Sequence, residues 1–238
     1  MTDNSSPDDS ALSRVQKRIA AACDAAARSH QAVSLLAVSK TRSAAELHSL
    51  IAAGQRAFGE NYLQEALEKI HALADQGLEW HFIGPIQSNK TRPIAEHFAW
   101  VHSVDRLKIA QRLNDQRPNN MAPLQICLQL NISGEASKSG VSLDELPTLA
   151  QAVAALPRLR LRGLMAIPAP SGDPAQQRRP LAAMRQALEG LQRQGLAVDT
   201  LSMGMSDDLE VAIAEGATMV RIGTALFGPR RKTHAAND

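Results

Sequence analysis

The chain has 238 residues, a formal net charge of +2 and 44% hydrophobic residues, which allow one large domain with a sizeable core. So small a positive excess, spread along the chain, argues against a nucleic-acid-binding protein. No apolar run approaches the roughly 20 residues that span a bilayer, and the polar N-terminus lacks a secretory signal, so we expect a cytoplasmic protein.

Residues 1–9 are polar and acidic, and we expect them to be a disordered tail. A helix is predicted over 10–28, with Asp9 or Ser10 as its N-cap. Short apolar or β-branched runs, typical of strands, follow at 33–39, 56–58, 79–83, 100–104, 124–132, 160–166, 200–203 and 219–222. Amphipathic stretches between them predict helices near 43–53, 61–76, 88–96, 105–115, 143–155, 174–195 and 206–215.

Eight strands that alternate with helices favour a single (β/α)8 TIM barrel over residues 10–228, followed by a C-terminal tail over 229–238. The strand runs are continuously apolar, as expected for parallel strands that helices cover. The competing fold is a doubly wound open sheet, which usually has a Gly-rich turn after its first strand. Ser39-Lys40-Thr41-Arg42 occupies that place here, so we prefer the barrel.

Lys40 ends the first predicted strand. A lysine ammonium at the mouth of a buried strand is costly unless it is used, and such a lysine can lose its charge and become a nucleophile toward aldehydes. The alternative is an ordinary lysine whose ammonium reaches solvent at the strand end. Because the carboxyl ends of barrel strands face one mouth, Asn61 and Tyr62 are expected near Lys40.

Two segments near the C-terminus are typical of phosphate-binding turns, because barrels often bind phosphate through the loops after strands seven and eight. Ser206 is predicted to cap a helix over 207–215 and to donate its hydroxyl to a phosphate oxygen. Gly223 lets the backbone approach closely, and Thr224 adds a hydroxyl. Either segment alone is also an ordinary turn. Together with an aldehyde-reactive lysine, they predict pyridoxal 5′-phosphate (PLP), an aldehyde that carries a phosphate.

Arg221 lies within the apolar run of the last strand. A buried arginine stays charged and needs a partner. One interpretation places it against the pyridine nitrogen of the cofactor, where a permanent cation disfavours protonation and weakens the ring as an electron sink. The other is a salt bridge with a barrel acid such as Glu60 or Glu210.

Other reactive residue types show no functional spacing. His81 and His102 lie near strand ends without metal-ligand spacing, so we expect hydrogen-bonded core or rim histidines and no metal site. Cys23 and Cys127 form no CxxC pair and are expected to be free thiols. The loop Lys138-Ser139-Gly140 either contacts phosphate or a partner, or is a mobile surface loop.

From about residue 12 to 228, the chain resembles the family of pyridoxal phosphate homeostasis proteins, the YggS-like family. The resemblance lies, in order, in the segments LLAVSKT (35–41), FGENY (58–62), WHFIGPIQSNK (80–90), GLM (163–165), SMGMSDDLE (202–210) and VRIGTALFG (220–228). One departure is that Thr41-Arg42-Ser43 lacks the proline that often follows the lysine motif.

The resemblance implies a barrel like the cofactor domain of alanine racemase and other fold-type III proteins, without their C-terminal β-domain. It implies that Lys40 holds PLP as a Schiff base, that Ser206, Gly223 and Thr224 hold the phosphate, and that the protein keeps intracellular PLP in balance. The full set of predicted cofactor-binding residues is Lys40, Asn61, Tyr62, Met203, Ser206, Arg221, Gly223 and Thr224.

A PLP carrier is favoured over an amino-acid racemase. Two-base proton transfer needs positioned groups on both faces of the substrate carbon, and racemases with this barrel take a tyrosine from their added domain across a dimer. This chain ends ten residues after Gly228 and has one tyrosine, Tyr62. No catalytic residue is therefore predicted, although a weak racemase-like activity stays open. We expect a monomer that binds PLP, with PLP-dependent apoenzymes as candidate acceptors.

Overall fold

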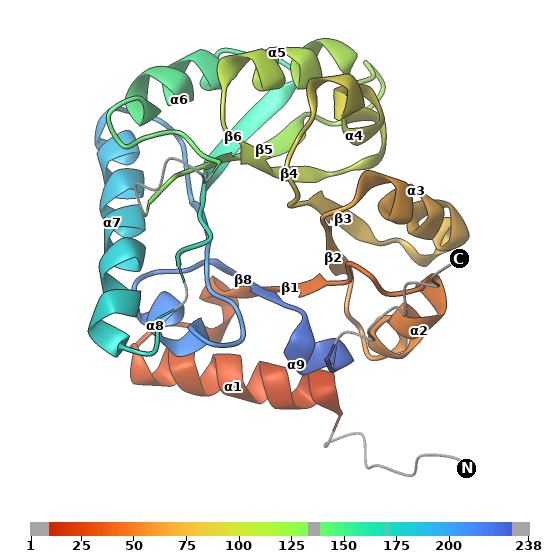
Figure 1. Ribbon diagram of the computed structural model, residues 1–238, viewed down its shortest axis with the longest axis vertical. Helices are drawn as coiled ribbons and strands as arrows, with labels where there is room; N and C mark the ends of the chain where they lie inside the picture. Colours follow the sequence, from red (N-terminus) through yellow and green to blue (C-terminus); the bar gives the residue numbers. More distant parts are fainter. Residues whose placement is uncertain (1–9, 133–138, 170, 230–238) are drawn as a thin grey trace, which may run out of the picture.

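Eight parallel strands close into one barrel, in the order β1 to β8, in the computed structural model, which describes residues 10–132, 139–169 and 171–229. The strands are β1 Ser34–Val38, β2 Ala57–Glu60, β3 Glu79–Phe82, β4 Trp100–Val104, β5 Leu124–Gln129, β6 Leu159–Met165, β7 Thr200–Ser202 and β8 Met219–Ile222. The first strand pairs with the second and with the last, which completes the ring (Figure 1). The predicted TIM barrel is confirmed. The predicted tails lie outside the described residues, apart from residue 229.

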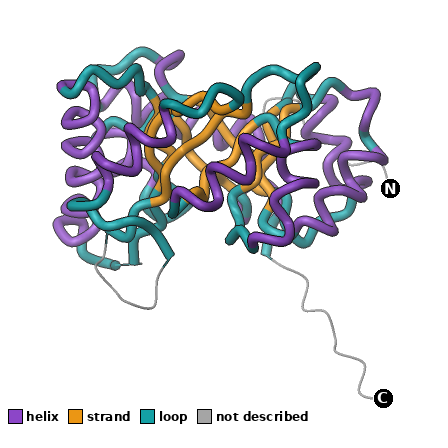
Figure 2. The backbone as a smooth tube through the Cα atoms, turned by 90° about the horizontal axis from the view of Figure 1, so that it is seen from above, coloured by secondary structure: helices purple, strands orange, loops and turns teal. Residues whose placement is uncertain are grey.

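Helices form the outer layer of the barrel (Figure 1), and a second view shows the strands at the centre with helices on both sides (Figure 2). They are α1 Ala11–Ala25, α2 Ala44–Ala52, α3 Leu63–Ala72, α4 Thr91–His97, α5 Leu107–Gln116, α6 Leu146–Ala154, α7 Pro174–Arg193, α8 Leu209–Ala214 and α9 Thr224–Phe227. No helix in the described ranges combines the length and apolar character needed to cross a membrane.

Of two predicted boundaries, local sequence preference gave one correctly and the other wrongly. Ser10 is the N-cap of α1, because its hydroxyl accepts a hydrogen bond from the N–H of Ser13 at 3.1 Å. The strand predicted over 124–132 ends earlier, at Gln129. The next residue, Leu130, forms an isolated bridge with Val141 instead of extending the strand.

The main hydrophobic core lies between the strands and the helices, with Phe58 and Phe98 among its largest fully buried side chains. Smaller clusters of buried residues are separate from this core. One consists of Leu36, Ile83 and Met219, and another of Trp100, Cys127 and Met165. Strand residues alternate between the two faces of a sheet, so the barrel interior is filled by these clusters and by polar side chains.

Both cysteines are buried free thiols, as predicted. Burial raises the pKa of the Cys127 thiol to about 12, so this side chain is a neutral filler of the barrel interior. In the described part of the chain, no group of three or more histidine, cysteine, aspartate or glutamate side chains is arranged to hold a metal ion.

Candidate functional site

A cavity of about 560 Å³ opens at the carboxyl ends of the barrel strands. Its wall consists of Arg18, Val38, Lys40, Asn61, Ile83, Ile167, Met205, Ser206, Asp207, Arg221, Gly223, Thr224 and Ala225. Six of the eight predicted cofactor residues are among them, and they come from the ends of four strands. This is the face at which barrels of this architecture carry their sites.

Lys40 reaches the cavity because β1 places alternate residues on the inner face of the barrel. Leu36 belongs to a buried inner cluster, Val38 lines the cavity, and Lys40 follows at the same spacing. The backbone then turns at Thr41, whose φ of 62° is rare for a β-branched residue. The N–H of Thr41 donates to Oε2 of Glu65 at 3.0 Å. Lys40 is thus held at a sharp bend of the chain.

The loop after β7 differs from its predicted form. We expected Ser206 to cap the following helix, but α8 begins at Leu209 with Asp208 as its N-cap. Gly204, with φ at 93°, turns the chain, and the Asp208 side chain accepts the N–H of Met205 at 2.6 Å. The predicted capping role of Ser206 was therefore wrong. Ser206 lies in the turn before the helix, where it lines the cavity.

Several hydrogen-bond donors in this wall have no partner among the residues that the structure describes. They are the hydroxyls of Ser206 and Thr224 and the N–H groups of Thr224 and Ala225. Ser206 is half-buried, whereas Thr224 and Ala225 are exposed. Several donors that line one cavity and have no protein partner in the described ranges fit a ligand rich in acceptor oxygens. A phosphate has this character.

Arg18 is a cationic wall residue that the sequence reasoning missed. It belongs to α1 and forms an ion pair with Glu210 of α8, in which Nη2 donates to Oε2 at 2.7 Å. This hydrogen bond raises the pKa of Arg18. One signal was available: Arg18 lies three residues after Val15 and four before Ala22, within the buried face of the helix.

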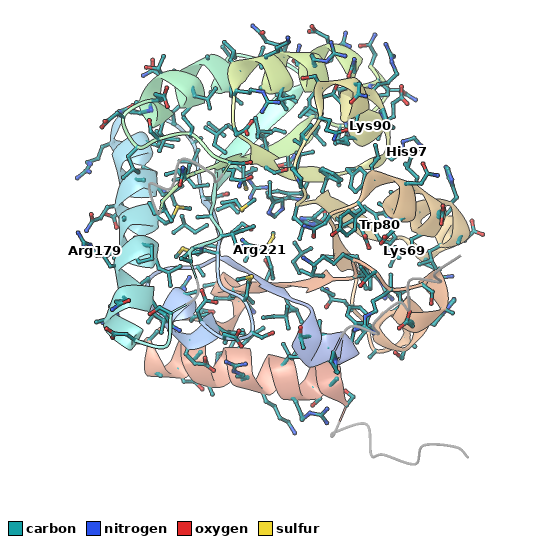
Figure 3. The ribbon with its side chains drawn as sticks, viewed as in Figure 1. Lys69, Trp80, Lys90, His97, Arg179 and Arg221 are labelled. Atoms are coloured by element: carbon teal, nitrogen blue, oxygen red, sulfur yellow. The ribbon has the colours of Figure 1, made fainter. Side chains whose placement is uncertain are left out.

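Arg221 is buried inside the barrel, 4% exposed, at the floor of the cavity (Figure 3). Its Nη1 donates to the carbonyl and the hydroxyl of Ser202, the latter at 2.9 Å, and its Nη2 donates to the carbonyl of Ala166 at 2.8 Å. Neither Glu60 nor Glu210 contacts it, because each pairs with another cation. The salt-bridge alternative is therefore wrong. Burial lowers the pKa of Arg221 to about 10, so it remains cationic at neutral pH.

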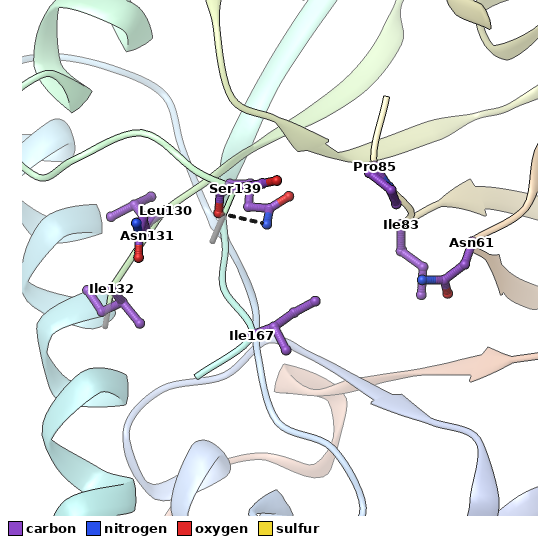
Figure 4. A pocket seen from close by; sticks show the side chains of 9 residues that line it. Asn61, Ile83, Pro85, Leu130, Asn131, Ile132, Ser139 and Ile167 are labelled. Carbon is purple, nitrogen blue, oxygen red and sulfur yellow. Dashed lines mark hydrogen bonds between the residues drawn. The ribbon is translucent and has the colours of Figure 1, made fainter. Parts of the chain in front are cut away.

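Asn61 also lines a second cavity of about 290 Å³, whose wall Figure 4 shows. The two cavities share Asn61, Ile83 and Ile167. The side-chain oxygen of Asn61 is buried and has no hydrogen-bond partner in the described ranges, so it is an acceptor left for a ligand. In the second cavity, Gln129 donates to the carbonyl of Ser139 at 3.1 Å. Residue 138 of the predicted loop lies outside the described residues.

Two predicted cofactor residues do not line the cavity. Met203 is fully buried in the main core, and Tyr62 is 52% exposed at the N-cap of α3. The interpretation of the two histidines is confirmed. His81 and His102 are fully buried, and their rings are joined by a hydrogen bond of 2.9 Å.

Comparison with known proteins first defines the class of barrel to which this chain belongs. The Alanine racemase, N-terminal domain family matches residues 12–231. An alanine racemase from Corynebacterium glutamicum has the same fold with a TM-score of 0.65 at 21% identity, covering 95% of this chain and 63% of that one. Fold and site thus define a barrel of the alanine racemase type.

Relatives of higher sequence identity define the family more narrowly. A pyridoxal phosphate homeostasis protein of Pseudomonas aeruginosa is 64% identical over 92% of this chain and 94% of its own length, and one of Escherichia coli is 57% identical over 92% and 95%. PipY of Synechococcus elongatus, solved with PLP bound, has a TM-score of 0.78 at 38% identity, covering 88% of this chain and all of that one. The chain belongs to the pyridoxal phosphate homeostasis protein family.

Proposed function

We propose that this protein holds PLP in the cavity at the barrel mouth and thereby serves PLP homeostasis. The observation that carries the proposal is that Lys40, the guanidinium of Arg221, and the hydroxyls of Ser206 and Thr224, which have no partner in the described part of the chain, line one cavity. PLP matches this arrangement, because it joins an aldehyde, a phosphate and a pyridine nitrogen in one small molecule. The PLP-bound structure of PipY supports the same ligand.

Each wall residue has a separate part in holding the ligand. Lys40 would hold the aldehyde of PLP through its Nζ. The hydroxyls of Ser206 and Thr224, with the N–H groups of Thr224 and Ala225, donate to phosphate oxygens. Arg18 adds a positive charge to the wall of the same cavity. Asn61 supplies an acceptor for a hydroxyl on the ring.

Arg221 faces the ring nitrogen in this proposal. Bound PLP supplies an aldehyde that captures amines and a ring that withdraws electrons. A guanidinium that stays charged keeps the ring nitrogen unprotonated, because a second positive charge beside it is unfavourable. The ring then withdraws electrons weakly, which suits a protein that stores and hands over PLP more than one that turns over amino acids.

We extend the proposal to a carrier that acts as a cytoplasmic monomer and passes PLP to apoenzymes. In support, Tyr62, the only tyrosine of the chain, lies outside the cavity wall. The second candidate function is a weak racemase-like activity. One observation favours it: Asp207 places a carboxylate in the wall of the cavity that also holds Lys40.

The visible absorption spectrum of the purified protein tests PLP binding. We expect PLP to produce a band in the wild type and in Lys90→Ala, which removes an exposed lysine, but not in Lys40→Ala. Borohydride reduction followed by peptide mapping should place the cofactor on Lys40. The absence of any band after PLP is added to the wild type would overturn the proposal.

Deuterium exchange separates the carrier from the racemase. The PLP-loaded protein is incubated with L-alanine in D₂O, and the Cα proton signal is followed by NMR. A carrier leaves this signal unchanged. Exchange that disappears in both Lys40→Ala and Asp207→Asn would favour the racemase-like activity.

A further inference from the structure

A chain of hydrogen bonds crosses the barrel interior and ends at Arg221. Glu79 Oε1 lies 2.9 Å from Nε2 of His81, and Nδ1 of His81 lies 2.9 Å from Nε2 of His102. Nδ1 of His102 lies 2.8 Å from the hydroxyl of Ser202, which lies 2.9 Å from Nη1 of Arg221. The chain links β3, β4, β7 and β8 without a gap.

The two ends of this chain of hydrogen bonds lie at opposite faces of the barrel. Glu79 is the first residue of β3, and its side chain is 51% exposed. Arg221 is near the end of β8 and lines the cavity at the mouth. Because parallel strands all begin at one face and end at the other, the chain connects the face opposite the mouth with the floor of the cavity.

Chemistry fixes the direction of every bond in the chain. Arginine can only donate and a carboxylate can only accept. Nε2 of His81 therefore donates to Glu79. Because burial keeps both histidines neutral, Nδ1 of His81 accepts from Nε2 of His102, and Nδ1 of His102 accepts from the hydroxyl of Ser202, which itself accepts from Arg221. Both histidines are satisfied as neutral Nε2–H tautomers.

The charges of the groups agree with this arrangement. Burial lowers the pKa of both His81 and His102, which keeps them neutral. The hydrogen bond from His81 lowers the pKa of Glu79, which keeps it a carboxylate. Hydrogen bonds that all run in one direction polarise and strengthen one another. Among the residues that the structure describes, Arg221 donates side-chain hydrogen bonds only to the carbonyls and the hydroxyl described above.

We propose that Glu79, His81, His102 and Ser202 are positioning residues that hold the Arg221 guanidinium against the cofactor ring, with the Glu79 carboxylate as the final hydrogen-bond acceptor on the far face. This inference rests on the proposed function, because the ring is that of bound PLP. It assigns a role in PLP retention to residues that do not line the cavity.

Two variants interrupt this chain of hydrogen bonds with little change in side-chain volume. Ser202→Ala removes one link, and its control, Ser103→Ala, removes a buried hydroxyl of β4 that bonds to the carbonyl of Gly84 instead. Glu79→Gln removes the charged end, and its control, Glu68→Gln, removes an exposed carboxylate of α3. The probes are PLP and its analogue in which C–H replaces the ring nitrogen.

We expect Ser202→Ala and Glu79→Gln to bind PLP about three- to tenfold more weakly than the wild type. Both should bind the analogue within about twofold of the wild type, since Arg221 has no ring nitrogen to face there. The controls should match the wild type for both probes. Without ligand, ¹⁵N shifts should show His81 and His102 as Nε2–H tautomers.

The inference is overturned if the wild type binds PLP while the two variants match their controls, or if they lose PLP and the analogue equally. An Nδ1–H tautomer of His102 in the wild type would overturn it as well. A wild type that binds neither probe overturns the proposed function itself, and with it the role of the chain in PLP retention.

Discussion

Nζ of Lys69 lies 2.5 Å from Oε1 of Glu60, and neither side chain is more than 4% exposed. The same ammonium donates to the carbonyl of Ser39 at 2.7 Å, and the Ser39 hydroxyl donates to Glu60. Burial raises the pKa of Glu60, and the charge of Lys69 offsets part of that rise. Lys69 thus ties α3 to β2 and to the residue that precedes Lys40.

Removal of one partner of this pair should destabilise the fold strongly. We expect Lys69→Met to lower the free energy of unfolding by about 3–5 kcal/mol, because it leaves the Glu60 carboxylate buried without a counter-charge. The double variant Lys69→Met with Glu60→Gln should recover most of this loss. Urea unfolding measures both, with the exposed Lys90→Met as control. Equal stability of the single and double variants would contradict the ion pair.

Ser206→Ala tests the phosphate contact. The hydroxyl of Ser206 makes no hydrogen bond elsewhere in the described chain, so its loss should act on the ligand alone. We expect PLP to bind about tenfold more weakly, since a hydrogen bond to a charged group contributes roughly 1.5–3 kcal/mol. Pyridoxal, which lacks the phosphate, should be unaffected. Equal losses for both ligands, or a similar effect of the exposed Ser49→Ala, would argue against the contact.

Arg221→Gln should loosen PLP retention while the fold survives. The fold should tolerate the change because Arg221 forms no ion pair with a described carboxylate, so its loss leaves none of them without a partner. We expect the dissociation constant for PLP to rise more than about tenfold, with an unchanged circular dichroism spectrum. Arg160→Gln, at an exposed position of β6, is the control. A folded Arg221→Gln protein with wild-type affinity would remove Arg221 from the site.

His102 should make stability depend on pH. Burial lowers its pKa well below 6.5, with smaller contributions from His81 and Arg221. Below pH 6.5 the unfolded chain takes up a proton at this position that the native chain does not. The free energy of unfolding therefore falls by about 1.4 kcal/mol for each further pH unit. Above pH 6.5 His102 is neutral in both the native and the unfolded chain, so it causes no loss of stability there.

The comparison of wild type with His102→Gln isolates this effect. Urea unfolding between pH 5 and pH 7.5 should give a smaller loss of stability toward acid in the variant. His48→Gln, which removes an exposed histidine of α2, should keep the slope of the wild type. Parallel slopes for wild type and His102→Gln would contradict a neutral buried His102.

The part of the site that sequence predicts best is the set of residues at strand ends. Lys40, Ser206 and Thr224 are far apart in the chain, yet parallel strands in a closed barrel bring their carboxyl ends together. Recognising the strands was therefore enough to place them. The start of α8 was missed because the side chain of Asp208 accepts a backbone N–H within the loop, which sequence preference alone does not reveal.

Contacts that depend on side-chain geometry could not be predicted. Arg18 reaches the cavity only because α1 packs beside α8 and α9. The partners of Arg221 are the carbonyl and hydroxyl of Ser202 on β7 and the carbonyl of Ala166 just after β6, and these contacts carry no signal in the sequence. His81 and His102 were expected to be hydrogen-bonded, but their mutual bond requires the register of β3 against β4.

The pairing of β1 with β8 also determines when, during synthesis, the cavity at the barrel mouth can form. Leu36 lies opposite Arg221 in this pairing, so the ring closes only between the first and last strands of the chain. During synthesis Lys40 leaves the ribosome long before Gly223 and Thr224, and contacts so distant in sequence form late. Under the proposed function, a nascent chain therefore carries Lys40 without the groups proposed to hold phosphate. We therefore expect PLP to bind only after the barrel has closed.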